Sequence, residues 1–321
     1  MSTFVIAAQL EIVTEQINRY VTLFLLLLGV IGNLCNCLVF TQRNLRSNPC
    51  CVYFLVASLA NLILCITALT PRSITGWNPN ADLTETVSAF CRLLMFLLLS
   101  ARCIVAWIIA FASVDRYLTS SPNVQRRQMS KLKNSYCCIS LICIISLLIW
   151  LEGFFCFDAN QVGTPIKCYT TSDVCQMYNN LAIAFFIIII PVIVMLVFGF
   201  STIKNIHGNR RVTTNLNNEH TGSTNRRSES SLTKMLLIQV LILTLFSLPL
   251  AIITLYLSWT FYQEKPLLQQ IIEGFLFNIF LLMAFIPNCI SFCLYTLSGS
   301  VFRQTFIDIG KRTMRRLSCY H

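Results

Sequence analysis

The chain has 321 residues, of which 55% are hydrophobic and 12% are charged, and its mean hydropathy is +0.68. Soluble domains carry about twice this share of charged residues, and a single core of this size could not bury so much apolar surface. The composition therefore excludes a soluble domain and indicates a lipid bilayer as the solvent. The formal net charge of +11 then favours basic loops beside a membrane over a nucleic-acid-binding surface.

Seven stretches are long and apolar enough to cross a membrane, which takes about 20 mostly apolar residues. They lie at residues 19–40, 51–69, 87–118, 135–155, 177–203, 232–259 and 267–297. No strict alternation of polar and apolar residues suggests a β-barrel. Because lipid offers no partner to backbone polar groups, each stretch is predicted to be a helix. The expected fold is all-α: a seven-transmembrane helix bundle at residues 19–297, after an extracellular N-terminus at residues 1–18.

Two further segments lie outside the predicted spans. Residues 205–231 are rich in Asn, Arg, Ser and Thr and are predicted to form a solvated cytoplasmic loop. In residues 298–321, Phe302, Phe306 and Ile309 fall on one helical face, which predicts a short interfacial eighth helix before a cytoplasmic tail. Cys319 in that tail is a candidate palmitoylation site, and an unmodified cysteine is the alternative.

The distribution of charge predicts the orientation in the membrane. Basic residues strongly outnumber acidic ones in the segments on one side of the spans, for example at Arg126, Arg127, Lys131 and Lys133. On the other side, where Arg72 is placed, acidic residues are in the majority. Basic loops stay in the cytoplasm. The N-terminus is therefore expected outside the cell and the C-terminus inside.

The third predicted span ends in Asp115-Arg116-Tyr117. Charges at a membrane edge are costly unless they face water or a partner, so this tripeptide is a candidate functional site. Further residues in the other spans strengthen this interpretation, because together with the tripeptide they form one pattern. They are Cys91 upstream, Gly32-Asn33, Trp150, Pro191, Pro249, and Tyr295 ahead of Phe302-Arg303. Over nearly the whole chain this pattern resembles the rhodopsin-like family of G-protein-coupled receptors.

The resemblance implies roles for several residues. Arg116 would be an activation switch, with Asp115 and Tyr117 as its neighbours and Pro249 as a hinge. Glu229 stands where some family members place an acid that holds the arginine across helices; a solvated loop residue is the alternative. As a partly exposed ion pair, Arg116–Glu229 would contribute at most about 1 kcal/mol.

The resemblance also implies a disulfide outside the membrane. Cys91 would pair with a cysteine of the loop between the fourth and fifth spans, either Cys168, the first choice, or Cys175. Oxidising surroundings favour such a bridge.

The sequence departs from the family pattern near the predicted switch. The region before Pro249 lacks the usual tryptophan, and Gly199 leaves no tyrosine in the fifth span to meet Tyr295. Ser291 begins the segment that usually reads Asn-Pro-x-x-Tyr. The activation network is therefore expected to be partly rewired.

The expected ligand contacts are Leu98, Arg102, Leu281, Phe285 and, at the rim, Glu273. Leu98 stands where amine receptors carry an aspartate, which disfavours a buried amine, and no lysine in 267–297 could hold retinal. Arg102 within a span is a functional candidate by default. It is expected to contact a ligand carboxylate or carbonyl, or to pair internally with Glu152.

A short extracellular peptide is the predicted ligand and a heterotrimeric G protein the predicted partner, at the plasma membrane and in contact with membrane lipid. The mildly acidic outer surface favours a basic ligand. The segment from Ile290 to Arg303 also resembles invertebrate receptors for short amidated neuropeptides of the FMRFamide type. No cofactor or metal is expected, and the chain is not expected to be an enzyme. A transporter or channel is the alternative.

Overall fold

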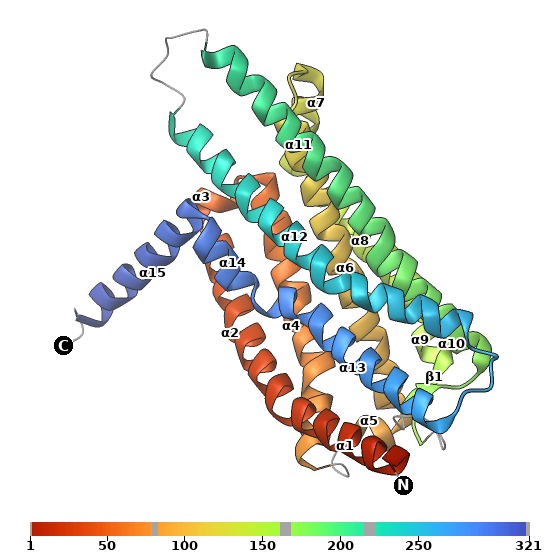
Figure 1. Cartoon of the computed structure of the whole chain (residues 1–321). Helices are drawn as coiled ribbons and strands as arrows, with labels where there is room; N and C mark the ends of the chain where they lie inside the picture. Colours follow the sequence, from red (N-terminus) through yellow and green to blue (C-terminus); the bar gives the residue numbers. More distant parts are fainter. Residues whose placement is uncertain (1, 79–82, 161–167, 215–222, 319–321) are drawn as a thin grey trace.

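The computed structural model describes residues 2–78, 83–160, 168–214 and 223–318, and most of them are helical. Within these residues seven helices are long and apolar enough to cross a membrane: Ala8–Phe40, Pro49–Trp77, Ser88–Ser120, Leu132–Cys156, Asp173–His207, Glu229–Trp259 and Leu267–Cys289. They form one bundle (Figure 1). The predicted seven-helix fold is confirmed.

The first half of the bundle is built from α1 (Ser2–Gln16), a π-helical turn η1 (Ile17–Val21), α2 (Thr22–Phe40), α4 (Pro49–Trp77) and α6 (Ser88–Ser120). The short helices α3 (Arg43–Arg46), α5 (Leu83–Thr86) and α7 (Val124–Met129) connect or follow them. Next come α8 (Leu132–Ile149), the 3₁₀ turn η2 (Trp150–Glu152) and α9 (Gly153–Cys156). Because α4 packs against both α2 and α6, these three helices form the centre of this half.

The second half contains α10 (Asp173–Ala182), the π-helical η3 (Ile183–Ile189), α11 (Ile190–Thr214), α12 (Ser223–Trp259), α13 (Leu267–Cys289) and α14 (Ser291–Ser298). The last helix, α15 (Ser300–Ser318), follows α14 and points away from the bundle (Figure 1). It matches the predicted eighth helix but is longer. The predicted lipidation site, Cys319, lies outside the described residues.

One end of the bundle carries a small exception to the all-α prediction. Strands β1 (Phe157–Asp158) and β2 (Tyr169–Thr170) pair antiparallel, with Phe157 opposite Thr170 and Asp158 opposite Tyr169. We call this end, which also holds α5, α9 and α10, the hairpin end (Figure 1). The end where Asp115-Arg116-Tyr117 lies is called the opposite end.

Several predicted boundaries differ from those of the structure. The segment 205–231 was predicted to be a loop, but α11 continues to Thr214 and α12 begins at Ser223. A helix that is already nucleated gains one hydrogen bond with each added residue, so polar composition alone does not end it.

The first span also begins earlier than residue 19, because the spanning helix starts at Ala8. Arg19, the first residue of the predicted span, is satisfied within the fold. Its Nη2 lies 3.0 Å from Glu15, its Nε donates to the Gly76 carbonyl at 2.7 Å, and its guanidinium lies 5.3 Å from the Trp77 ring.

Gly76 allows the close contact between α4 and η1. A Cβ at this position would lie 2.8 Å from the backbone nitrogen of Arg19. We therefore expect Gly76→Ala to lower the free energy of unfolding by about 1–3 kcal/mol, since overpacking against backbone cannot relax through a rotamer change. The measurement is thermal unfolding of the purified protein in detergent. Gly274→Ala is the control: its Cβ would meet nothing within 4 Å, so unchanged or raised stability is expected.

Candidate functional site

Arg116, near the C-terminal end of α6, is almost fully buried at 1% exposure. Its Nη2 lies 2.9 Å from Asp115 Oδ2, and its Nη1 pairs with Glu229 Oε2 on α12. The same Nη2 donates to Asn48 Oδ1 at 3.2 Å. One guanidinium thus joins α6 to α12 and to the start of α4.

Asn48 holds this cluster together from a third element. It caps α4 ahead of Pro49, where its Oδ1 accepts from the Cys50 N–H at 3.0 Å. Its Nδ2 donates to Glu229 Oε1 at 2.8 Å. The alternative of an unpaired, solvated Glu229 is therefore wrong in this conformation, although its side chain is 46% exposed. Asn48 was not among the predicted site residues, because an Asn-Pro helix start signals a cap but not this second role.

The neighbours of Arg116 are fixed by further contacts. Ser130, after α7, donates to Asp115 Oδ1 at 2.5 Å. The Tyr117 hydroxyl accepts from Arg126 at 2.8 Å, and its ring lies 5.3 Å from Phe198 on α11. One group remains unsatisfied, because the Nε of Arg116 is buried without a hydrogen-bond partner. The arginine is held firmly, but not every donor it carries is used.

Tyr295 on α14 lies in an aromatic cluster with Phe40, Phe54 and Phe302, at centroid distances of 5.6, 5.0 and 5.8 Å. Its hydroxyl donates to Gln239 Oε1 on α12 at 2.6 Å. This bond gives Tyr295 a partner on α12, although Gly199 stands where the family usually has a tyrosine in the fifth span. Pro249 lies ten residues further along α12, inside the helix.

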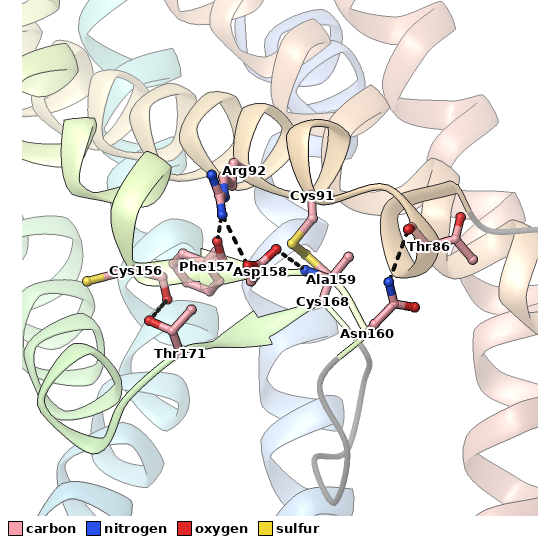
Figure 2. The surroundings of a disulfide bond; sticks show 10 residues. All are labelled: Thr86, Cys91, Arg92, Cys156, Phe157, Asp158, Ala159, Asn160, Cys168 and Thr171. Atoms are coloured by element: carbon pink, nitrogen blue, oxygen red, sulfur yellow. Dashed lines mark hydrogen bonds and ion pairs between the residues drawn. A yellow bond between two sulfur atoms is a disulfide. The ribbon is translucent and has the colours of Figure 1, made fainter.

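At the hairpin end, Cys91 and Cys168 form a disulfide, and Cys175 pairs instead with Cys156. The first bridge ties the segment before β2 to α6, as Figure 2 shows. Arg92, the residue after Cys91, donates to the Phe157 carbonyl at 3.2 Å and to Asp158 Oδ2 at 3.1 Å. The second bridge was not predicted, because Cys156 sits at the edge of an apolar run and was not considered as a partner.

The Asp158 carboxylate at this end is expected to make the stability of the protein depend on pH. Its pKa lies below the usual 3.8, because the Ser88 hydroxyl, the Ala159 N–H and Arg92 favour the charged carboxylate. A lowered folded-state pKa stabilises the protein above the usual pKa, and this stabilisation is lost as the pH falls through the folded value. We expect the melting temperature to fall more steeply below about pH 4 than in Asp158→Asn, measured from about pH 6 to pH 3. Parallel curves for the two proteins would contradict this.

Four of the predicted ligand residues come together between α4, α6 and α13. Leu98 and Leu281 pack against a buried cluster that contains Phe285. The guanidinium of Arg102, only 8% exposed, lies 5.2 Å from the centroid of the Phe285 ring. The result is an apolar site with one cationic group, nearer the hairpin end than Arg116 along α6.

Glu273 lies outside this set. Its carboxylate accepts from Tyr256, Lys265 and Gln269 at 2.9, 2.6 and 2.9 Å. The internal Arg102–Glu152 pair is also absent: within the described residues Arg102 lies against the Phe285 ring, and Glu152 Oε1 is buried without a hydrogen-bond partner. The sequence could not place these groups, because depth along a helix does not tell which side of it a residue faces.

These features define a polytopic membrane protein in which a buried arginine links helices at one end and a disulfide-tied hairpin lies at the other. The family model for the seven-transmembrane receptor (rhodopsin family) matches residues 32–295. The chain therefore belongs to the rhodopsin family of seven-transmembrane receptors. No curated protein matches it.

Proposed function

We propose that this receptor lies in the plasma membrane with the hairpin end outside, binds a short peptide there, and activates a heterotrimeric G protein inside. The observation that carries the proposal is the Arg116 cluster, because one buried side chain joins α6, α12 and the start of α4. Any movement of α12 that opens this end must break the contact with Glu229. Ligand binding outside and G-protein binding inside would then favour the same rearranged state, and each would strengthen the other.

The proposed movement uses α12 and α14. Pro249 lacks the backbone N–H that a continuous helix needs, so bending is least costly near it. The Tyr295–Gln239 bond couples α14 to the part of α12 on the Arg116 side of this proline. Contacts of a ligand with Leu98, Leu281 and Phe285 would shift α13 and, through it, α14 and α12. Arg116 would then be released toward the G protein.

A peptide is the proposed ligand class because the site between α4, α6 and α13 combines an apolar wall with one polar group. Such a site suits a ligand with an apolar side chain and a polar end group. The orientation rests on the basic residues at the opposite end, such as Arg126 and Lys133. The same residues suit anionic lipid, and α15, with Phe306 and Ile307 exposed, is proposed to lie against the membrane.

The test is G-protein activation in cells that express this chain, challenged with peptides that have an amidated or a free C-terminus and, separately, with amines. A peptide response that disappears in Arg116→Gln at equal surface expression would support both the receptor activity and the switch. A response that survives Arg116→Gln would contradict the role of Arg116, and a response to amines alone would contradict the ligand class.

Glu229→Gln is expected to raise signalling without any ligand by up to about fivefold. Since Glu229 is half exposed, its pair with Arg116 contributes at most about 1 kcal/mol, which corresponds to that shift between two states. The measurement is binding of a non-hydrolysable GTP analogue to the G protein in membranes that contain the receptor. Asp308→Asn on α15 removes an exposed acid that makes no contact with Arg116 and should leave the basal rate unchanged. An unchanged or lowered rate in Glu229→Gln would rule out the restraining role.

A further inference from the structure

Two arginines, rather than one, lie within the bundle toward the hairpin end. Arg72 belongs to α4, which runs eight residues beyond the predicted end of the second span at residue 69 and stops at Trp77. It was placed among the outer residues, but it lies inside the spanning helix Pro49–Trp77. Both side chains reach α13, where Arg72 contacts Asn278 and Arg102 contacts Phe285. Two like charges in a membrane bundle are costly without a counter-ion.

Neither arginine has an acidic partner among the residues that the structure describes. Nη1 of Arg72 donates to the neutral Oδ1 of Asn278 at 2.5 Å. Arg102 makes no hydrogen bond or ion pair with the described part of the chain, although its side chain is more than nine-tenths buried. Its contact is the face of the Phe285 ring. Stacking uses the face of a guanidinium and leaves its in-plane N–H donors available for a bidentate acceptor.

Two acids toward the hairpin end, Glu273 and Asp158, do not neutralise these arginines. Glu273 is surrounded by Tyr256, Lys265 and Gln269, and Asp158 pairs with Arg92. The sequence alone favoured a basic ligand because the outer surface carries an excess of acids. In the folded receptor, both of these acids already have cationic partners, and Glu152, whose Oε1 is buried without a hydrogen-bond partner in the described part of the chain, forms no ion pair with either arginine.

We propose that Arg72 and Arg102 form the binding site for a carboxylate group of the ligand, with Leu98, Leu281 and Phe285 packing against its apolar portion. The proposal deepens the receptor function proposed above, and it changes the expected ligand from an amidated or basic peptide to an acid. The carboxylate could belong to the free C-terminus of a peptide or to a small apolar acid. Both sources offer two coplanar oxygens, which match a guanidinium.

Binding of a carboxylate is tested on the purified receptor in lipid nanodiscs, by the melting temperature. The probes are 3-phenylpropionate and the tripeptide Ala-Leu-Phe, each compared with its own amide, which has the same shape without the charge. At about ten times its dissociation constant, an acid should raise the melting temperature by about 3 °C, and its amide should not. Stabilisation by the tripeptide acid alone identifies a peptide C-terminus, and stabilisation by 3-phenylpropionate identifies a small acid.

Arg102→Met and Arg72→Gln should each abolish this shift. The proposal is overturned if an amide stabilises as well as its acid, if the shift survives in Arg102→Met, or if neither acid has an effect at about 10 mM. The assay needs no G protein. It can therefore fail while Arg116-dependent signalling stands, and signalling can fail while it succeeds.

A second measurement requires no ligand. Methionine keeps the contact with Phe285 and removes the uncompensated charge, so Arg102→Met should raise the melting temperature of the ligand-free receptor. Arg92→Met is the matched control at the same end, and it should lower the melting temperature because Arg92 holds Asp158 and the Phe157 carbonyl. A lowered melting temperature in Arg102→Met would show that the arginine is already neutralised, and would overturn the proposal.

Discussion

Replacing Arg116 with alanine is expected to lower the free energy of unfolding by about 3 kcal/mol and to abolish activation of the G protein. The stability effect follows from burial, since the side chains of Arg116 and Asp115 are only 1% and 5% exposed. Removing one partner of a buried pair leaves the other charge uncompensated, which costs more than the pair itself contributed. Glu229 adds little to this loss, because water screens its half-exposed carboxylate.

A double variant separates the two effects of this substitution. In Asp115→Asn/Arg116→Ala the buried carboxylate is gone, so most of the lost stability should return, while activation should remain absent because no guanidinium is left to contact the G protein. Arg126→Ala, which removes an exposed arginine at the same end, should change stability by less than about 0.5 kcal/mol. Retained activation in the stable double variant would contradict the switch role of Arg116.

The sequence was sufficient to predict the bundle because hydropathy reports directly on which segments can lie in lipid. It was less reliable at the ends of the spans. Arg19 and Arg72 both lie inside spanning helices. There Arg19 donates a hydrogen bond to the Gly76 carbonyl, and Arg72 donates one to Asn278. Such partners come from other helices, so no local pattern in the sequence could reveal them.

The residues of the candidate switch were likewise only partly predictable from the sequence. The tripeptide Asp115-Arg116-Tyr117 and the spacing of Glu229 were recognisable by resemblance to the receptor family. Asn48 and Ser130 were not, because a helix cap and a serine after a short helix have ordinary local explanations. Only the packing of α4 and α7 beside the end of α6 gives them contacts with Glu229 and Asp115.

The disulfide pairing was predictable only in part. Cys91 has a family position, which left Cys168 and Cys175 as candidate partners. The choice between them depends on the hairpin: β1 and β2 pair in a register that places Cys168 beside α6. Once that pairing is made, Cys175 lies one turn into α10, within reach of Cys156 at the end of α9.

Removing the Cys91–Cys168 disulfide in a Cys91→Ser/Cys168→Ser double variant is expected to lower the free energy of unfolding by about 2–4 kcal/mol. The bridge joins residues 77 apart in sequence, whereas Cys156–Cys175 joins residues 19 apart. In the chain-entropy description the longer loop gains more from closure, by about 1 kcal/mol. Replacing both members of a pair avoids a free thiol that could exchange with the remaining bridge.

The two bridges should also differ in their effect on binding. Cys91–Cys168 connects the hairpin to α6, while Cys156–Cys175 joins two parts of the same connection. Without the first bridge, the hairpin is held to α6 mainly through Arg92 and becomes more mobile. Ligand binding should therefore weaken more in this variant than in Cys156→Ser/Cys175→Ser. Melting temperature and probe binding of both double variants test this, with Cys137→Ser, an exposed free thiol, as the control. Equal losses in the two variants would mean that the hairpin is held by its strand pairing and by Arg92 rather than by the Cys91–Cys168 bridge.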